Sequence, residues 1–352
     1  MFDSVRVGPQ WVLERVDIEG IASAYGLTVE GKMTTLGGAT NGVARVESDR
    51  GAVVVRVHRP WTTPARLASV HHIQAHLRTH GLPIPPTLVT RTGTSWTELH
   101  DRLVEVTVYV PHDGPADTWG RMGEAYEHLG RLHHALSQVP PSTLVPPPYS
   151  SYADPHVALR MLRETERAFH ADQGRAGYAA ATATRTAAGT LLRRLAHERA
   201  HYEAALLRSI IHGDYGGENV LMRGEQVAAI LDFDYMAARA RIVDVAYTLY
   251  WTLDRLHVPT GVATFSKNDL ARAGDLLRRY GRTASPLTAA EVTALPFEMA
   301  RVPLYHIVEA GYTAAVPYTP GPVDQTLAFA RHLPVAQWLV IEAERVRHLL
   351  AT

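Results

Sequence analysis

The hydrophobic pattern of this chain changes near residue 112. Three short runs rich in β-forming residues lie between residues 32 and 58, and glycine-containing turns separate them. This arrangement predicts a three-stranded antiparallel meander. Beyond residue 112, hydrophobic residues recur with a helical period, first over residues 117–139. We therefore expect a small β-rich lobe over residues 1–111 and a larger, mainly helical lobe over residues 112–352.

The remaining segments follow the same division. Residues 1–30 have an amphipathic character, and proline and glycine mark the ends of a helix predicted over residues 64–80. The other expected elements are strands at 87–91 and 103–110, helices at 154–171, 186–207, 242–257, 268–281, 297–316 and 334–350, and a strand-rich insert at 210–232.

The composition is that of an ordinary globular enzyme. Of the 352 residues, 46% are hydrophobic, and 35 basic side chains balance 35 acidic ones. Nucleic-acid binders usually carry a basic excess, so neither nucleic acid nor a membrane surface is an expected partner. The N-terminus lacks the apolar core of a signal peptide, no stretch is apolar enough to span a bilayer, and cysteine is absent. We expect a cytoplasmic protein, whose oligomeric state the pattern leaves open.

The residues most informative about function lie in the strand-rich insert. Two apolar runs, 220–222 and 227–231, flank a turn and are expected to pair as a hairpin. Asn219 precedes the first run and Asp232 follows the second, so the hairpin brings both side chains to one end. Asp214 reaches the same place through the four-residue loop that precedes Asn219.

Two carboxylates and one carboxamide would then converge without a nearby lysine or arginine to neutralise them. Because buried unpaired carboxylates are costly, a cation is expected at this point. Oxygen ligands without cysteine or histidine favour Mg²⁺, which takes its remaining ligands from phosphate and water. The pattern indicates a phosphoryl-transfer site. Asp214 would orient the attacking hydroxyl and accept its proton, while Asn219 and Asp232 would hold the metal ion.

This segment resembles the catalytic region of the aminoglycoside phosphotransferase and choline kinase superfamily. The order His212-Gly213-Asp214, Asn219 and then Asp232 after an apolar strand is similar to the family's catalytic loop and metal-binding aspartate. The resemblance implies a protein-kinase-like α+β fold with two lobes. It also implies ATP or GTP and Mg²⁺ as cofactors, and a small-molecule hydroxyl as the phosphate acceptor.

Neighbouring residues have expected supporting roles. Asp244 resembles a structural aspartate that braces the catalytic loop in the family, and His212 is expected to hold that loop rather than to take part in chemistry. Asp234 is a candidate second metal contact, or else a solvated or helix-capping carboxylate. The stretch 53–60 is similar to the homoserine-kinase-like and stress-response-kinase-like branches of the superfamily.

The resemblance also implies the nucleotide contacts. Arg56 occupies the strand position at which the family has Lys or Arg against the α- and β-phosphates, and the preceding glycine-containing turn is placed to cover the triphosphate with backbone N–H groups. The expected nucleotide-binding residues are Gly37, Gly38, Thr40, Asn41 and Arg56, with Tyr109 and Val110 of the connector beside the base.

One residue of the family pattern is missing. The family has a glutamate on the helix after the Arg56 strand, but no Asp or Glu occurs between Arg50 and Thr97. The corresponding helix contains His71 and His72 instead. Arg56 would then contact phosphate directly, be held by a residue outside that helix, or be an ordinary salt-bridged strand residue.

Several alternatives stay open. Acidic and basic residues are nearly equal over 240–352, which does not favour a polycationic acceptor. We expect an amino alcohol, a sugar, an amino acid such as homoserine, or a weakly charged antibiotic, with a protein Ser or Thr as the remaining kinase option. The missing glutamate would also suit a degenerate kinase that binds nucleotide as a regulator. A metal-dependent hydrolase is a third class. His72, His76 and His80 fall on one helix face; we expect a solvated polar face there, with a zinc site as the alternative, because no carboxylate or cysteine accompanies them.

Overall fold

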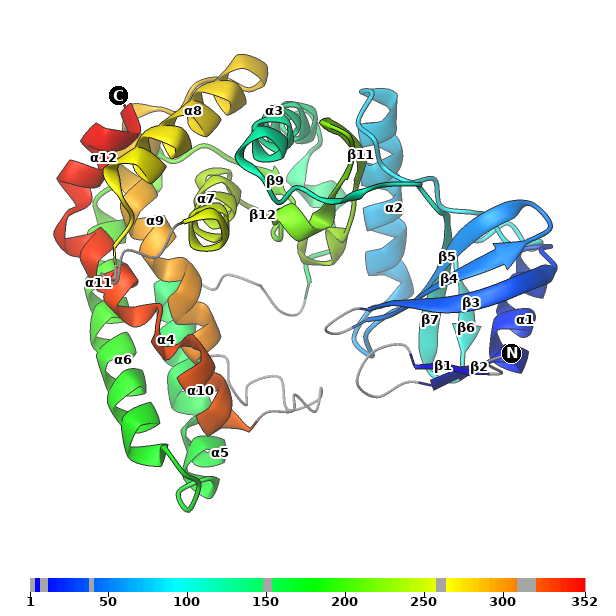
Figure 1. Ribbon diagram of the computed structural model, residues 1–352, viewed down its shortest axis with the longest axis horizontal. Coiled ribbons are helices and arrows are strands. Elements are labelled where there is room, and N and C mark those ends of the chain that lie inside the picture. Colours follow the sequence, from blue (N-terminus) through cyan, green and yellow to red (C-terminus); the bar gives the residue numbers. More distant parts are fainter. Residues whose placement is uncertain are drawn as a thin grey trace.

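The computed structural model describes residues 4–6, 12–37, 41–147, 154–257, 264–308 and 321–351. It has the α+β architecture expected from the sequence, with a small antiparallel sheet at one end and many helices at the other (Figure 1). No helix in these residues has both the length and the apolar character that crossing a membrane requires.

The sheet of the first lobe has five antiparallel strands in the order β3-β4-β5-β7-β6. Its first three strands form the expected meander, and Val46, Val55 and Val106 on its inner face are at most 1% exposed. Ile18 and Ile21 of the short helix α1 pack in the same cluster. The elements of this lobe are β1 (Ser4–Arg6), β2 (Val12–Glu14), α1 (Arg15–Ala24), β3 (Val29–Gly37), β4 (Gly42–Ser48), β5 (Gly51–Val57), α2 (Pro64–Thr79), β6 (Thr97–Leu99) and β7 (Arg102–Val108).

One strand prediction is wrong. Residues 87–91 do not form a strand in the sheet; only an isolated bridge joins Thr87 to Thr107. The edge position next to β7 is taken by β6 (Thr97–Leu99) instead. The prolines at 85 and 86 explain this difference in part, because proline cannot donate to a strand ladder.

Helix α2 lies between the sheet and the helical lobe (Figure 1). Thr63 caps its N-terminus by accepting a hydrogen bond from the Arg66 amide, and Pro64 occupies the first turn. Although α2 precedes residue 112, its side chains Val70, Ile73 and Leu77 belong to the hydrophobic core of the helical lobe. This helix therefore bridges the two parts of the fold.

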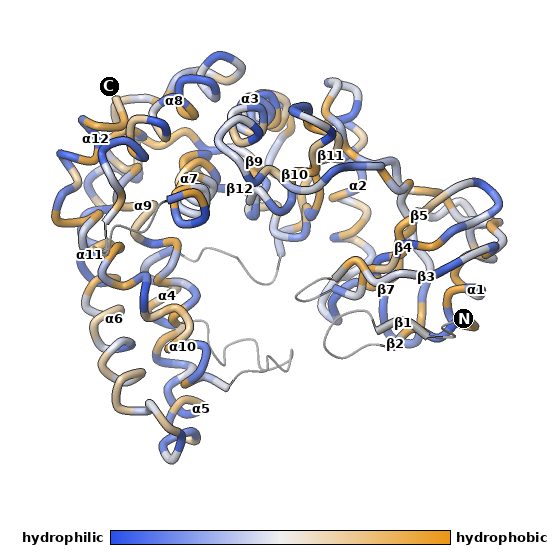
Figure 2. The backbone as a smooth tube through the Cα atoms, viewed as in Figure 1, coloured by the Kyte–Doolittle hydropathy of each residue, from blue (hydrophilic) through white to orange (hydrophobic). Residues whose placement is uncertain are grey.

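The helical lobe surrounds the hydrophobic helix α7, in which every residue from Ile242 to Tyr250 is buried. Figure 2 shows hydrophobic stretches along α7 and α9, while the far end of α8 is hydrophilic. The α-helices of this lobe are α3 (Trp119–Leu136), α4 (Pro155–Glu164), α5 (Glu166–Ala171), α6 (Tyr178–Ala200), α7 (Ile242–Leu256), α8 (Lys267–Thr283), α9 (Ala289–Val308), α10 (Pro322–Ala330), α11 (Leu333–Ile341) and α12 (Ala343–Ala351).

Two small sheets hold the strand-rich insert against α3 and α7. The predicted hairpin is present: β10 pairs antiparallel with β11, with Val220 opposite Ile230. A second pair, β9 with β12, lies before and after this hairpin in the sequence. The strands are β8 (Gly114–Pro115), β9 (Arg208–Ile211), β10 (Val220–Arg223), β11 (Gln226–Ile230) and β12 (Ala237–Ala240).

Candidate active site

The loop after β9 is held in place by the buried carboxylate of Asp244, on the first turn of α7. Asp244 accepts hydrogen bonds from the backbone amides of His212 (2.7 Å) and Gly213 (2.8 Å), and His133 of α3 lies 3.1 Å from the same carboxylate. Burial would raise the pKa of Asp244, but the hydrogen bond from His133 and the nearby imidazoles hold it below its ordinary value. An ionised acceptor thus fixes the loop.

The ring of His212 connects this loop to the strand that carries Asp232. Its Nε2 lies 2.9 Å from the carbonyl oxygen of Leu231, and its Nδ1 accepts a hydrogen bond from the Asp214 amide at 3.2 Å. These two contacts assign the proton to Nε2. Burial lowers the pKa of His212, so the neutral ring is the stable form.

Position 213 requires a glycine, both because of its backbone conformation and because there is no space for a side chain. Its φ is +83°, in the left-handed region, and a Cβ at this position would lie 2.2 Å from the carbonyl oxygen of Tyr235. Any side chain here would push the loop away from the segment after Asp232.

Asp214 projects from this loop next to α7. Its Oδ1 accepts a hydrogen bond from the hydroxyl of Tyr247 at 2.7 Å. Burial and the neighbouring Asp232 raise the pKa of Asp214 well above its ordinary value, while the Tyr247 hydroxyl opposes the shift. Tyr247 lies one helical turn after Asp244, so one face of α7 contacts both the loop backbone and the loop carboxylate.

The hairpin brings Asn219 and Asp232 to one end, as the sequence predicts. The Leu231 amide donates to the carbonyl oxygen of Asn219 at 2.8 Å. The side-chain amide of Asn219 donates to the Asp214 carbonyl oxygen at 2.8 Å, which orients the carboxamide and identifies its other atom as the oxygen Oδ1. Asp232 has a φ of +61°, an uncommon conformation for a non-glycine residue and one typical of functional sites.

One sequence-based expectation about charge is wrong. The carboxylates are not left without a cation, because Arg56 of β5 reaches them from the other lobe. Its guanidinium is 2.7 Å from Asp232 and 3.0 Å from Asp234. Asn41 also donates to Asp234, at 2.8 Å. Arg56 has no glutamate of α2 as partner, and Asp234 is a paired carboxylate, neither solvated nor a helix cap. Asp234 lines a small pocket together with Arg59, Arg66 and Tyr235, and we call this place, where the sheet side meets the segment after the hairpin, the cleft.

Two further arginines near the start of α2 were not identified from the sequence. Arg59 bonds the Tyr235 hydroxyl, and its guanidinium lies 4.6 Å from the centre of that ring. Arg66 donates to the backbone carbonyl oxygens of Asp234 (3.0 Å) and Met236 (2.8 Å). No sequence signal near 232–236 indicates these contacts, because about 170 residues separate the partners.

The missing helix glutamate has a counterpart on the sheet. Glu105 of β7 lies opposite Arg56 in the strand register and is 7% exposed. Nε2 of His71, on α2, is 2.6 Å from its carboxylate, and Nε2 of His58 is 3.4 Å from it. Sequence reasoning noted His71 but missed Glu105, whose place beside Arg56 follows only from the strand pairing.

The structure describes only some of the residues that were predicted to bind the nucleotide. Gly37 ends β3 and Asn41 reaches Asp234, whereas Gly38 and Thr40 lie outside the described residues. Tyr109 donates its amide to the Ala52 carbonyl oxygen, and it and Val110 lie at the half-buried start of the connector. Figure 1 shows this connector crossing from the sheet to α3.

The site has the donor set that a metal-bound nucleotide requires. Asp232 and the Oδ1 of Asn219 offer the hard oxygen atoms that could hold such an ion, and Asp234 offers a third nearby. Two buried polar atoms in the cleft, Asn41 Oδ1 and Arg56 Nε, have no hydrogen-bond partner. Since buried polar atoms are nearly always paired, these residues fit a ligand with phosphate oxygens and an ion.

The alternative zinc cluster on α2 is not formed. His76 lies 3.2 Å from the Ala135 carbonyl oxygen, and Nδ1 of His80 lies 3.0 Å from the His76 carbonyl oxygen. Within the described ranges, no three His, Cys, Asp or Glu side chains are grouped to hold a metal ion.

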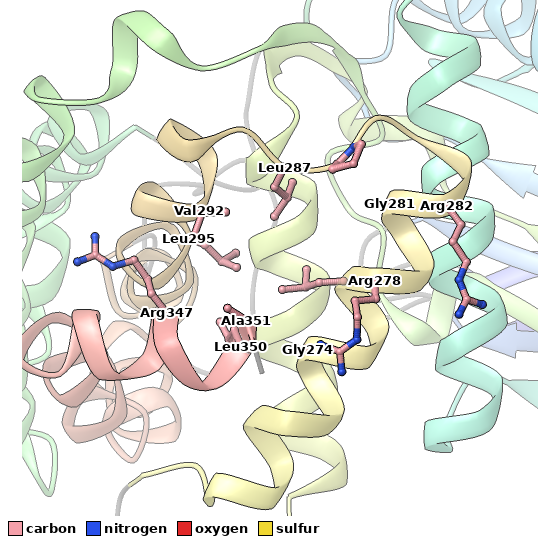
Figure 3. A pocket seen from close by; sticks show the side chains of 12 residues that line it. Gly274, Arg278, Gly281, Arg282, Leu287, Val292, Leu295, Arg347, Leu350 and Ala351 are labelled. Atoms are coloured by element: carbon pink, nitrogen blue, oxygen red, sulfur yellow. The ribbon is translucent and has the colours of Figure 1, made fainter.

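A separate cavity of about 370 Å³ lies away from these residues, between α8, the start of α9 and α12. Figure 3 shows Leu287, Leu295 and Leu350 facing it, while the guanidinium of Arg347 points away. None of the predicted site residues lines it.

Most of the chain is similar in sequence to known proteins. The sequence model described as the phosphotransferase enzyme family matches residues 34–280, well over half of the chain. A homoserine kinase from Beijerinckia indica subsp. indica is 25% identical over 294 residues, which cover 81% of each chain. This chain is therefore similar to a curated kinase over most of its length.

Solved structures agree on the fold. The microcompartment-associated aminopropanol kinase superposes with a TM-score of 0.68 at 18% identity, covering 95% of this chain and 98% of that one. Amicoumacin kinase hAmiN, solved with AMP-PNP, Ca²⁺ and amicoumacin, gives 0.61 at 16% identity, covering 86% and 87%. These similarities confirm the expected two-lobe fold of small-molecule kinases.

Proposed function

The chain belongs to the phosphotransferase enzyme family, and from this premise we propose that it transfers the γ-phosphoryl group of ATP or GTP to a hydroxyl of a small zwitterionic or neutral molecule. The observation that carries the proposal is the convergence of Asp214, Asn219 and Asp232 at one end of the β10–β11 hairpin, where Arg56 of the sheet contacts Asp232.

Asp214 is the proposed proton acceptor. Its Oδ1 accepts a hydrogen bond from the hydroxyl of Tyr247, which fixes the orientation of the carboxylate. A raised pKa makes a carboxylate a better proton acceptor near neutral pH. The loop that carries Asp214 is fixed by Asp244 and His212, which keeps the carboxylate in a defined position.

The residues that would hold the cofactor are Asn219 and Asp232, with Asp234 as a third oxygen ligand and Arg56 against phosphate oxygens. Bound Mg²⁺ would neutralise negative charge on the phosphates. Asn41 and the glycine-containing turn before it would cover the phosphates from the sheet side. Tyr109 and Val110 would lie beside the base.

The acceptor we propose is a compact hydroxyl compound with an amino group, such as an amino acid or an amino alcohol. Two facts support it: curated relatives include homoserine kinases, and the aminopropanol kinase shares the fold. The balanced charge of the chain agrees with an acceptor that is not a polycation. We expect the protein to act in the cytoplasm.

The test is ADP release from Mg·ATP and then Mg·GTP across a panel of hydroxyl acceptors: homoserine, aminopropanol, choline, hexoses, several antibiotics and a protein substrate. We expect one class of small acceptor to stimulate release. We further expect Asp214→Asn to lower turnover by about a thousandfold while ADP affinity stays near that of the wild type.

Asp275→Asn, on an exposed part of α8, is the matched control and should behave as the wild type. Equal turnover in Asp214→Asn would contradict the role of Asp214. If no acceptor stimulates release although Mg·ADP binds, the regulator interpretation replaces the kinase.

A further inference from the structure

The sheet provides a carboxylate where the family pattern has a helix residue. Glu105 pairs with Arg56 in the antiparallel register of β5 and β7, so both side chains lie on the same face of the sheet. The carboxylate is buried, and Nε2 of His71 lies 2.6 Å from it. Nε2 of His58 lies 3.4 Å from it. Nδ1 of His71 is bound in turn, 2.6 Å from the Ser95 hydroxyl.

His71 connects this carboxylate to the helical lobe. It lies on α2, next to Val70 and two residues before Ile73, both of which pack in the core of that lobe. Arg66, earlier on the same helix, is bonded to the backbone after Asp234. The contact between His71 and Glu105 therefore ties the sheet that carries Arg56 to a helix anchored on the catalytic lobe.

Arg56 needs a second partner for a simple electrostatic reason. In the described structure its guanidinium contacts Asp232 and Asp234, and its Nε is a buried donor without a hydrogen-bond partner. A metal ion held by Asp232 and Asp234 would compete for the same oxygens. A buried arginine that loses its acceptors is costly, so Arg56 would then depend on the remaining anions, which are the phosphate oxygens and the carboxylate of Glu105 on the same face of the sheet.

We propose that Glu105, held by its contact with His71, is the positioning residue that retains Arg56 against the nucleotide phosphates once Asp232 and Asp234 engage the metal ion. In the family pattern the helix supplies the carboxylate. Here strand β7 supplies it, as Glu105, and helix α2 supplies a histidine, His71. This inference rests on the proposed kinase function.

The charges around Glu105 support this role. Burial alone would raise its pKa, but His58 and His71 hold the pKa well below the ordinary value, so the carboxylate is ionised. The titratable groups near it include Arg56 of β5, His58 just after β5, His71 of α2 and Tyr25, whose pKa Glu105 helps to raise after burial. Its negative charge is also one cause of the raised pKa of Arg56, after Asp232 and Asp234.

The test is ADP affinity by calorimetry, with Mg²⁺ and then with EDTA, at a temperature at which all variants are folded. In Mg²⁺ we expect Glu105→Gln to weaken binding about tenfold, the effect of losing one charged hydrogen bond. In EDTA we expect less than about a twofold change, because Asp232 and Asp234 remain available to Arg56. A purely structural role of Glu105 would weaken binding equally in both conditions.

His71→Gln keeps the carboxylate but removes its support, and it should show a smaller loss with the same dependence on Mg²⁺. If Glu105→Gln does not fold, the binding measurements on His71→Gln test the proposal. The matched controls are His72→Gln, exposed on the same helix, and Glu98→Gln, exposed on β6; both should bind as the wild type. No loss in Mg²⁺, or the same loss with EDTA, would overturn the proposal. Failure of the wild type to bind Mg·ADP would instead refute the proposed function.

Discussion

At the scale of single residues, His212 shows how a proton is fixed by structure. Its Nε2 lies 2.9 Å from the Leu231 carbonyl oxygen, while Nδ1 accepts from the Asp214 amide. A second proton, on Nδ1, would meet the N–H of Asp214. Burial already disfavours the charged ring, so the folded protein holds His212 neutral and its pKa is lowered.

We expect this histidine to make stability depend on pH. An unfolded histidine takes up a proton near pH 6.5, whereas His212 in the folded protein does so only at lower pH. The unfolded state therefore binds more protons over that interval, and the free energy of unfolding falls as pH decreases. The slope from one such group is at most about 1.4 kcal/mol per pH unit.

The measurement is the free energy of urea unfolding between about pH 8 and about pH 5.5 for the wild type and His212→Gln. The variant should be less stable at the higher pH but should lose less stability on acidification. Because other histidines titrate in both proteins, the difference between the two slopes is the informative quantity. Parallel slopes would show that His212 is not the group responsible.

The residues that could be predicted from the sequence share one property. Asp214, Asn219, Asp232 and Asp244 lie within about 30 residues of one another, so hairpin geometry and spacing bring them together. Glu105 and the Arg56 contacts depend on strand register and on the approach of two lobes. Neither is encoded in a local pattern, which is why the expected unneutralised charge was wrong.

At the scale of elements, the periodic segments were easiest to predict. The meander and the helices α2, α3, α7 and α8 match their predicted ranges closely. Helix α6 begins at Tyr178, earlier than expected, because its first half is a run of alanine and threonine with no hydrophobic stripe. The predicted helix at 334–350 is two helices, α11 and α12, and α10 was missed.

Helix α2 is the element that connects sheet to active site, and Arg66 is its main polar anchor. Its guanidinium donates to the carbonyl oxygens of Val145, Asp234 and Met236. The side chain is 5% exposed, and burial lowers its pKa to about 10. A neutral aliphatic residue here would leave three carbonyl oxygens without this donor.

We expect Arg66→Leu to reduce the free energy of unfolding by about 2–4 kcal/mol, the cost of leaving buried acceptors unsatisfied. Thermal or urea unfolding measures the change. Arg78→Leu is the control on the same helix, because its guanidinium is 3.4 Å from one carbonyl oxygen, that of Pro85. A loss no greater than that of Arg78→Leu would mean that these contacts do not anchor α2.

At the scale of the whole molecule, helix α2 joins the lobes through hydrophobic packing, whereas the sheet itself meets the catalytic segment through a small number of polar groups. Arg56 and Asn41 from the sheet meet Asp232 and Asp234 from the hairpin, and Arg59 meets Tyr235. The two hydrophobic cores themselves are separate clusters. Opening of the cleft between the sheet and the segment with Asp232 and Asp234 therefore breaks a few polar contacts and exposes little hydrophobic core, provided that α2 stays packed on the helical lobe.

This division predicts that Arg56→Met loosens the cleft in the absence of nucleotide. The change keeps the aliphatic bulk of the side chain but leaves Asp232 and Asp234 without their shared cation, so the two carboxylates repel each other. Local opening then costs less free energy. We expect faster hydrogen–deuterium exchange in peptides covering 41–48 and 230–240, with little change in α7.

Arg45→Met provides the matched control, since Arg45 lies on the adjacent strand and pairs with Glu47 within the sheet. It should leave exchange in both peptides unchanged. Because the lobes have separate cores, the effect of Arg56→Met should be confined to the cleft segments and should not spread to the buried α7. Faster exchange throughout the helical lobe would show instead that Arg56 supports global stability and not the closure of the cleft.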